Sequence, residues 1–327
     1  MNKIAFITGI SGQDGSHLVE FLLSKEYKIY GLMRRTSTDN TWRIKNIIDK
    51  IEIVSGDVTD QSSLDRSINL IKPDEVYNLA AQSFVKASWD SPEYTFNTNA
   101  IGVIRLLEAI LHFGKKETKI FHASTSEMFG KVQEQPQNEN TKFYPRSIYG
   151  VSKLAGHWAA INYRESYNMF ISCAISFNHE SYRRGLEFVS RKISYNVAKI
   201  HLGLSDHIEL GNLDSMRDFG YAPEYVEAFW KMLQLDNPVD LVLSTGETHS
   251  IKEFVEEAFK VVGIDNWKDY VKQNPKFMRP AEVDYLCGDS TKAKALIGWN
   301  PIIRFKEIVK VMVDSDIERL FRGDKID

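Results

Sequence analysis

Short apolar runs alternate along the first half of the chain with longer segments in which apolar residues recur every three to four positions. The short runs, rich in β-branched residues, are typical of buried strands, and the longer period is typical of amphipathic helices. We expect strands at 4–8, 28–33, 51–55, 76–82, 119–123 and 170–176, with helices between them from about Leu18, at 62–71, at 92–113 and from about Ser147 to Tyr167. This alternation predicts an α/β protein with a Rossmann-like, doubly wound parallel sheet and right-handed crossovers.

The alternation of strand-like and helical segments is less regular in the second half of the chain. The spacing predicts helices at 188–202, 223–235, 251–262, 291–297 and 305–321, and strands at 207–210 and 241–244. We expect residues 1–177 to form a nucleotide-binding domain to which later segments, about 207–245, return. Residues 178–327 are then mainly a smaller, partly interleaved C-terminal α/β lobe that binds the substrate.

Composition narrows the class of protein. The 327 residues are 43% hydrophobic and 26% charged, with a net charge of −3. This is globular material without the basic field that nucleic acid or an anionic membrane requires. An apolar run of about 18 residues and a hydrophobic leader are both absent, so we expect a cytoplasmic protein. Cys173 and Cys287 stand in apolar surroundings without metal-ligand spacing, and we expect buried free thiols and no metal site.

A glycine-rich turn follows the first expected strand. Gly9, Gly12 and Gly15 precede the first helical segment. Glycines here allow a tight turn, let backbone N–H groups approach a pyrophosphate, and let the helix pack against the strand. The position predicts a dinucleotide site; the alternative is a purely structural turn.

Two arginines, Arg34 and Arg35, end the second expected strand, about twenty residues after the turn. An acid at this place accepts from the adenosine ribose, whereas an arginine pairs with a 2′-phosphate, so the pair favours NADP over NAD. The alternative is a solvated basic pair. Asp57, with Val58 after it, ends the third strand, where it meets the adenine or caps the next turn; the sequence leaves both open. The small residues Ala80 and Ala81 suit close approach to a cofactor.

Tyr149 and Lys153 are four positions apart at the start of a helical pattern and so share one helix face. An ammonium group near a phenol favours the phenolate, so we expect Tyr149 to act as a base near neutral pH. Thr125, Ser126 and Glu127 follow the fifth expected strand, at the sheet edge where ligands of such folds bind. The alternatives are a chance spacing for the pair and a helix-start carboxylate for Glu127.

Several longer strings carry a resemblance to a known family. They include the turn at 8–15, and the segments 34–37, 124–127, 143–147, 177–181, 212–214, 217–218 and 279–284. With Tyr149 and Lys153, they resemble the extended short-chain dehydrogenase/reductases that modify nucleotide sugars, and among these the GDP-mannose 4,6-dehydratase family. The resemblance runs nearly end to end.

The resemblance implies a chemistry. Tyr149 takes the proton of the sugar 4-hydroxyl while hydride leaves C4 for NADP⁺, and Lys153 lowers the tyrosine pKa and holds the nicotinamide ribose. Thr125 hydrogen-bonds the 4-oxygen, and Ser126 stands where glucose-type dehydratases carry an aspartate. Glu127 then removes the C5 proton, water leaves C6 and hydride returns to C6. Epimerases and reductases need no C5 base, so Glu127 favours elimination.

The resemblance also implies binding residues. Beside the residues named above, the cofactor is assigned to Gln13, Asp14, Leu79, Ser83, Tyr94, Lys153, His179 and Arg184. The GDP-sugar is assigned to Ser83, Asn178, Val189, Lys192, Arg217, Arg279 and Glu282. The loop 34–43 resembles a segment that reaches a neighbouring subunit, which implies a homodimer or homotetramer without nucleic-acid or membrane partners.

Departures from the family pattern leave alternatives open. Tyr182 replaces a proline, Phe84 replaces a histidine, and Trp42 replaces a small residue, either as an interface anchor or as an exposed or self-packed side chain. The substrate is GDP-mannose or a close relative such as a GDP-manno-heptose. The competing hypotheses are a nucleotide-sugar 4-epimerase or 4-reductase, and a non-catalytic NADP-binding protein.

Overall fold

The computed structural model describes residues 2–38 and 40–324, and a seven-stranded parallel sheet forms its centre. The strands lie in the order β11-β6-β5-β4-β1-β2-β3. Their bounds are β1 (Ile4–Thr8), β2 (Lys28–Met33), β3 (Glu52–Ser55), β4 (Glu75–Asn78), β5 (Lys119–Ala123), β6 (Phe170–Ser176) and β11 (Asp240–Leu243). The chain order reverses at β1, so a crevice is expected at the carboxyl ends of β1 and β4. The predicted Rossmann-like sheet is confirmed.

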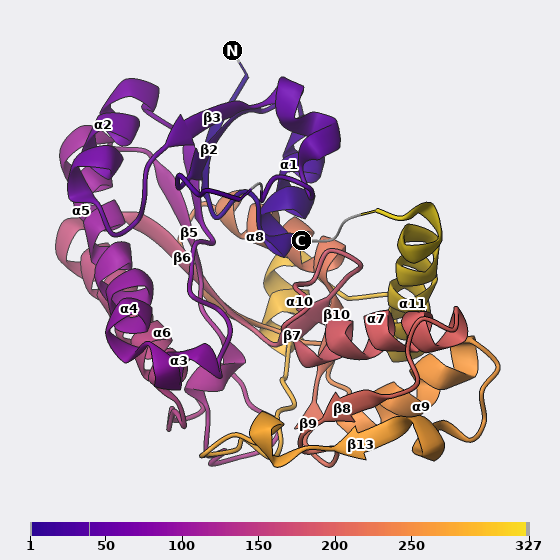
Figure 1. Ribbon diagram of the computed structural model, residues 1–327. Helices are drawn as coiled ribbons and strands as arrows, with labels where there is room; N and C mark the ends of the chain where they lie inside the picture. The colour runs from indigo at the N-terminus through magenta and orange to yellow at the C-terminus, as the bar shows by residue number, and fades with distance from the viewer. Residues whose placement is uncertain (1, 39, 325–327) are drawn as a thin grey trace.

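Helices cover both faces of the sheet, as Figure 1 shows. On one face lie α2 (Gln61–Ile71), α5 (Gly102–Phe113) and α6 (Ile148–Tyr167), and on the other lie α1 (Gln13–Ser24) and α8 (Ala222–Leu233). The apolar stripe of each helix packs on strand residues that point to its side. Phe229 of α8, for example, stacks on Phe121 of β5 with ring centroids 4.3 Å apart.

A second lobe has its own apolar core. It contains α7 (Val189–His201), α9 (Ile251–Val261), α11 (Phe305–Arg322) and β8 (Ile208–Leu210). β8 pairs with β13 (Val271–Gln273), whereas α8 and β11, from the same stretch 207–245, lie with the large sheet. Short pairs of strands complete the lobe: β7 (Asn178–Glu180) with β10 (Phe219–Tyr221), and β9 (Met216–Arg217) with β12 (His249–Ser250). The shorter helices are α3 (Ala87–Asp90), α4 (Pro92–Phe96) and α10 (Thr291–Ile297).

The prediction of one continuous α-helix at 92–113 is wrong in one respect. The segment consists of α4, a π-helical turn η2 (Asn97–Ile101) and α5. Asn99 ties this wide turn to the loop after β4, since its Oδ1 accepts from the Gln82 backbone N–H at 2.8 Å and its Nδ2 donates to the Gln82 carbonyl. A tertiary contact therefore decides the local geometry, as at many π-bulges.

The strand expected at 76–82 is too long. It ends at Asn78, because the Thr8 hydroxyl accepts from the backbone N–H groups of Leu79 and Ala80 at 3.1 Å each. The Leu79 N–H is shared between this hydroxyl and the Thr8 backbone carbonyl at 3.3 Å, and the Ala80 N–H goes to the hydroxyl. The residues that follow therefore form a loop over the crevice.

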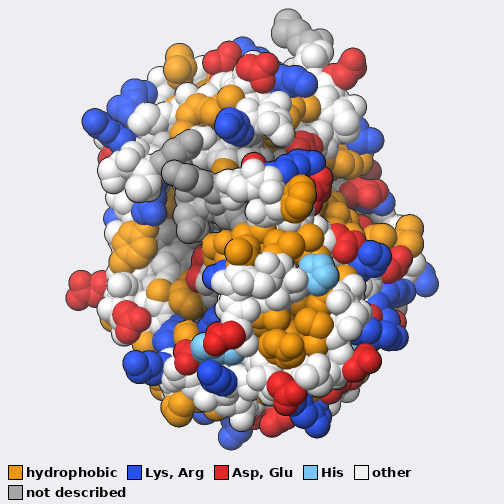
Figure 2. Space-filling model, turned by 45° about the vertical axis from the view of Figure 1, so that its right-hand side comes forward, with side chains coloured by type: hydrophobic (Ala, Val, Ile, Leu, Met, Phe, Trp, Pro, Cys, Tyr) orange, Lys and Arg blue, Asp and Glu red, His pale blue; other side chains and the backbone are white. Residues whose placement is uncertain are grey.

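The surface of the described residues carries both signs of charge, and Figure 2 shows Lys and Arg interspersed with Asp and Glu over one face. No helix in residues 2–38 and 40–324 is long and apolar enough to cross a membrane. Cys173 and Cys287 are buried and free, as the sequence predicts.

Candidate active site

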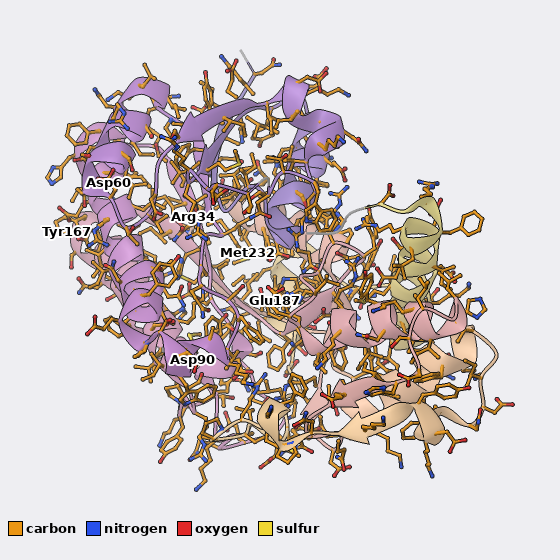
Figure 3. All side chains as sticks on the ribbon, in the orientation of Figure 1. Arg34, Asp60, Asp90, Tyr167, Glu187 and Met232 are labelled. Atoms are coloured by element: carbon orange, nitrogen blue, oxygen red, sulfur yellow. The ribbon has the colours of Figure 1, made fainter. Side chains whose placement is uncertain are left out.

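Two adjoining cavities lie along the carboxyl ends of the strands. The larger, of about 940 Å³, lies over β1, β2, β3 and β4. The smaller, of about 270 Å³, lies between the ends of β5 and β6 and the second lobe. Asp14, Ser83 and Arg184 line both. Arg34 and Glu187 are exposed residues that line the larger cavity, and Figure 3 labels Arg34 near the strands of the large sheet and Glu187 nearer the second lobe.

The residues that the sequence assigns to the site line these two cavities. The larger is lined by Gly9, Gly12, Gln13, Asp14, Gly15, Arg34, Arg35, Asp57, Val58, Leu79, Ala80, Ala81, Ser83, Tyr94 and Arg184. The smaller is lined by Thr125, Ser126, Glu127, Tyr149, Lys153, Asn178, His179, Val189, Lys192, Arg217, Arg279 and Glu282. The fold therefore brings residues from both halves of the chain together.

The glycine turn has no room for side chains. Gly9 has a φ of +73°, and a Cβ there would lie 2.8 Å from the Ala80 nitrogen. A Cβ on Gly15 would lie 2.3 Å from the Gly9 carbonyl oxygen. Because α1 begins immediately after the turn, at Gln13, backbone N–H groups and a helix N-terminus line the cavity. This cradle fits the pyrophosphate of a dinucleotide.

The far end of the larger cavity carries polar groups. Arg34 donates through Nη1 to the Tyr94 hydroxyl at 2.8 Å. Asp57 Oδ1 accepts from the Thr59 backbone N–H and hydroxyl, each at 2.8 Å. Of the two roles that the sequence leaves open for Asp57, this carboxylate fills the turn-capping one, while the residue still lines the cavity.

A part-buried ion pair ties the glycine turn to the second lobe. His179 Nε2 lies 3.0 Å from Asp14 Oδ2, and its Nδ1 lies 2.7 Å from the Phe177 carbonyl oxygen. Both ring nitrogens thus face acceptors, which suits the doubly protonated ring. Burial opposes this charge, but Asp14 raises the pKa of His179 above its usual value. The pair likewise lowers the pKa of Asp14 against the effect of burial. The positive charge of His179 thereby balances the negative charge of a carboxylate that lies beside the expected pyrophosphate.

Tyr149 and Lys153 lie in the first turns of α6, where the Ser147 hydroxyl caps the helix by accepting from the Gly150 N–H at 3.0 Å. Lys153 Nζ donates to the Ala123 carbonyl at 2.5 Å. Burial raises the pKa of Tyr149 to about 12 and lowers that of Lys153 to about 8. The expectation of an acidic phenol is therefore wrong for this arrangement. Burial is the largest effect on the pKa of Tyr149, and the Lys153 ammonium is directed at a carbonyl instead of at the phenol.

Thr125 also interacts with Tyr149. A hydrogen bond with Thr125 lowers the pKa of Tyr149, in part offsetting burial, whereas the charge of Glu127 raises it further. Thr125 also accepts from the Glu127 backbone N–H at 3.3 Å and so caps the short helix η3 (Ser126–Met128). Hydroxyl, phenol and carboxylate are therefore within one cavity, as proton transfer at a sugar requires.

Glu127 belongs to a row of four charges. Its Oε1 accepts from Arg279 Nη1 at 3.2 Å. The same Nη1 lies 3.7 Å from Glu282 Oε1, which in turn accepts from Arg217 Nη2 at 3.2 Å. Burial alone would lower the pKa of Arg279, but Glu127 and Glu282 raise it. The carboxylate is therefore held from the second lobe, which distinguishes it from a plain helix-start acid.

Aromatic residues that the sequence did not assign to the site also line the smaller cavity: Phe84, Phe177, Phe188, Phe219, Phe229 and Phe277. The rings of Phe84 and Phe188 meet edge to face at 5.9 Å, and Lys192 Nζ lies 3.2 Å from the Phe277 ring centroid. Burial lowers the pKa of Lys192. Apolar residues have no sequence pattern that marks them as site residues. The one indication in the sequence was that Phe84 replaces a histidine of the family pattern.

A buried arginine supports the loop beside both cavities. Arg191 is fully buried; its Nε donates to Asp316 of α11 at 2.9 Å and its Nη1 to the Tyr182 carbonyl at 2.5 Å. Trp42 packs within the same chain, with the guanidinium carbons of Arg43 and Arg319 at 4.2 and 4.7 Å from its ring. Residue 39, in the loop 34–43, lies outside the described residues.

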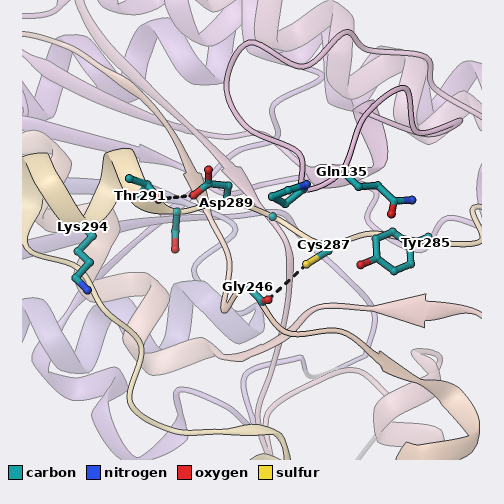
Figure 4. A pocket seen from close by; sticks show the side chains of 10 residues that line it. Gln135, Gly246, Tyr285, Cys287, Asp289, Thr291 and Lys294 are labelled. Atoms are coloured by element: carbon teal, nitrogen blue, oxygen red, sulfur yellow. Dashed lines mark hydrogen bonds between the residues drawn. The ribbon is translucent and has the colours of Figure 1, made fainter.

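A third hollow, of about 560 Å³, lies apart from these groups between residues 135–136, 246 and 285–294 (Figure 4). Asp289 there accepts from Thr291, and Cys287 Sγ donates to the Gly246 carbonyl at 3.5 Å. Asp289 thus binds a side chain of the same hollow, and Cys287 binds its backbone. Among the described residues, no group of His, Cys, Asp and Glu is arranged to hold a metal ion.

The fold is shared with solved enzymes of nucleotide sugars. UDP-glucose 4-epimerase from Thermus thermophilus, solved with NAD, superposes with a TM-score of 0.85 at 25% identity, covering 98% of this chain and 100% of that one. DesIV from Streptomyces venezuelae, a dTDP-glucose 4,6-dehydratase solved with NAD, gives 0.88 at 20% identity over 99% and 100%. The fold is that of a short-chain dehydrogenase/reductase, and the glycine turn of the larger cavity fits a dinucleotide.

Sequence similarity identifies one family among the proteins that share this fold. A model of the family described as GDP-mannose 4,6 dehydratase matches residues 6–312. The GDP-mannose 4,6 dehydratase of Drosophila melanogaster is 50% identical over 97% of this chain and 87% of that protein. GDP-mannose 4,6 dehydratase 2 of Arabidopsis thaliana is 50% identical over 99% and 89%. The chain belongs to the GDP-mannose 4,6-dehydratase family.

Proposed function

We propose that this protein is a hydro-lyase that converts GDP-mannose to the GDP-4-keto-6-deoxy sugar. The observation that carries the proposal is the Glu127 carboxylate in the same cavity as Tyr149 and Thr125. A tyrosine and threonine suffice for a reaction confined to C4. A carboxylate beside them supplies the base that elimination across C5 and C6 needs.

The chain's residues then divide the proton transfers. Tyr149 takes the proton of the sugar 4-hydroxyl, and Thr125 stabilises charge on the 4-oxygen by a hydrogen bond. The resulting ketone acidifies the C5 proton, which Glu127 removes and passes to the C6 hydroxyl as it leaves as water. When hydride returns to C6, the proton that Tyr149 took from the 4-hydroxyl is available for C5. Because the pKa of Tyr149 is about 12, we propose that Lys153 turns from the Ala123 carbonyl toward the phenol when the site is filled.

The cofactor of this proposal is NADP, supported by Arg34 and Arg35 at the end of β2. Gly9, Gly12 and Gly15 hold its pyrophosphate, and Lys153 holds the nicotinamide ribose. When bound, the nicotinamide accepts hydride from C4 and returns it to C6, so it ends the cycle unchanged.

The GDP-sugar belongs in the smaller cavity. We assign the diphosphate to Arg217 and Arg279, since guanidinium groups bind phosphate through two parallel hydrogen bonds. Asn178, Val189, Lys192, Ser83 and Glu282 complete the substrate wall.

A homodimer or homotetramer is part of the proposal. Large apolar side chains are exposed on α4 and α6 in support of it, among them Trp158 at 55% and Tyr167 at 53% exposure. Sedimentation with and without NADP tests the assembly, and a monomer under both conditions contradicts it. We also propose a cytoplasmic location, which imaging of the tagged protein tests.

The decisive assay is mass spectrometry of the product of purified enzyme, NADP and GDP-mannose. The expected product has lost one water without net oxidation. A GDP-manno-heptose assayed in parallel shows which sugar is preferred. Formation of the C4 epimer would support a 4-epimerase, a 4-keto product that keeps its C6 hydroxyl and forms with release of reduced cofactor would support a 4-reductase running in reverse, and no turnover of any GDP-sugar would overturn the proposal.

A further inference from the structure

The row of charges around Glu127 joins two parts of the molecule. Glu127 follows β5 of the large sheet, whereas Arg279 and Glu282 come from the loop after the one-turn helix η5 (Pro275–Phe277), and Arg217 ends β9. All four side chains are sheltered, with exposed fractions of 11% for Glu127, 26% for Arg279, 22% for Glu282 and 6% for Arg217. Charge-assisted bonds in such a site are stronger than in water.

The guanidinium of Arg279 has room for two tasks. In the part of the chain that the structure describes, its carboxylate contacts, to Glu127 and Glu282, are both made through Nη1. A guanidinium has five N–H donors in a rigid planar fork. The edge formed by Nη2 and Nε is thus able to bind an anion in the smaller cavity, which Arg279 lines, while Nη1 keeps its bond to Glu127.

We propose that Arg279 is the positioning residue of Glu127, so that the side chain that receives the substrate diphosphate also holds the carboxylate that removes the C5 proton. This inference rests on the proposed function. Binding of the nucleotide end of the substrate then orders the base at the sugar end. Glu127 stands on the short helix η3, which the Thr125 hydroxyl caps. A base held to within a fraction of an ångström transfers a proton faster than a mobile one.

Arg217 is the matched comparison. It lines the same cavity and carries the same charge, but its carboxylate hydrogen bond goes to Glu282 at 3.2 Å and its other bond to its neighbour's carbonyl, that of Met216. If both arginines serve only the diphosphate, their removal has the same kind of effect. If Arg279 also positions Glu127, its removal has an additional effect on the elimination step alone.

The experiment compares Arg279→Gln and Arg217→Gln in the assembled enzyme with NADP. The readouts are KM, kcat, the kinetic isotope effect with GDP-mannose deuterated at C5, and the absorbance of reduced nicotinamide in a single turnover. We expect Arg279→Gln to lower kcat by about 10- to 100-fold, the loss of one charge-assisted bond in the transition state. The C5 isotope effect should increase and reduced nicotinamide should accumulate, because oxidation at C4 precedes the slowed step. Arg217→Gln should mainly raise KM.

Thermal unfolding of each variant is the check on folding. If Arg279→Gln does not fold, Arg279→Lys carries the test, because it keeps the charge but loses the fork and should show the same isotope signature. A higher KM with unchanged kcat and isotope effect for the Arg279 variants would overturn the inference while leaving the proposed function intact. Failure of the unmodified enzyme to turn over GDP-mannose would instead contradict the proposed function.

Discussion

The two cavities are built in different ways. The larger is lined mostly by backbone and by strand-end residues from the first half of the chain, such as 9–15 and 34–35, although residues 184–185 and 187–188 also contribute to it. The smaller is lined by charged side chains that meet only in the folded chain, such as Glu127 and Arg279. A binding site of the first kind can be recognised from the spacing of residues along the chain. A chemical site of the second kind depends on the packing of one lobe on another.

The largest expected effect concerns the chemistry of the smaller cavity. Glu127→Gln keeps the shape of the side chain but removes the base, and we expect formation of the 4-keto product to fall by roughly 100- to 10,000-fold. Mass spectrometry of the product measures it. Reduction of bound nicotinamide by GDP-mannose should persist, because that step needs Tyr149 and not Glu127. Activity close to that of the unmodified enzyme would favour a 4-epimerase or 4-reductase.

The next effect concerns the cofactor cavity. Arg34→Glu places a carboxylate where we assign the 2′-phosphate, and we expect NADP affinity to fall by about 10- to 100-fold with little change for NAD. Calorimetric titration with each cofactor measures the ratio. Arg66→Glu, on the exposed side of α2, is the control for a change of charge alone. Equal losses for NADP and NAD would contradict the assignment.

Alanine substitutions in the glycine turn test how tightly the backbone of the turn is packed. A Cβ on Gly15 meets the Gly9 carbonyl oxygen at 2.3 Å, whereas one on Gly12 meets the same atom at 3.2 Å. We expect Gly15→Ala to lower the free energy of unfolding by about 1–3 kcal/mol and Gly12→Ala by less. Denaturant unfolding measures both. Equal stabilities would show that the backbone of the turn yields more easily than its packing indicates.

The smallest effect concerns the contact that joins the lobes, His179 with Asp14. The pKa of His179 is raised in the folded chain, so its stabilisation is fully present below the usual value of about 6.5 and is lost as pH rises through the raised value. At a pH below about 6.5, we expect the melting temperature of the unmodified protein to be roughly 2 °C higher than that of His179→Gln. The difference should shrink as pH increases. A difference that does not change with pH would show that the ring acts by packing alone.

Much of the fold could be predicted because its signals are local. The alternation of strand-like and helical periods was sufficient for the parallel sheet, and Ser147 marked the start of the helix that bears Tyr149. Errors arose where a distant group competes with the local pattern. The Thr8 hydroxyl ends β4 early, and the amide of Asn99 holds a π-helical turn inside an expected helix.

By itself, the sequence determined the residue types at the site and their place on strand ends and helix starts: the glycine turn, Arg34, Glu127, Tyr149 and Lys153. Only the tertiary structure decided how their charges interact. It buries Tyr149 and raises its pKa to about 12, directs Lys153 to the Ala123 carbonyl, and sets Arg279 on Glu127. Spacing along the chain orders residues on one element. Burial and ion pairing are properties of the space between elements, and that space exists only when the lobes pack.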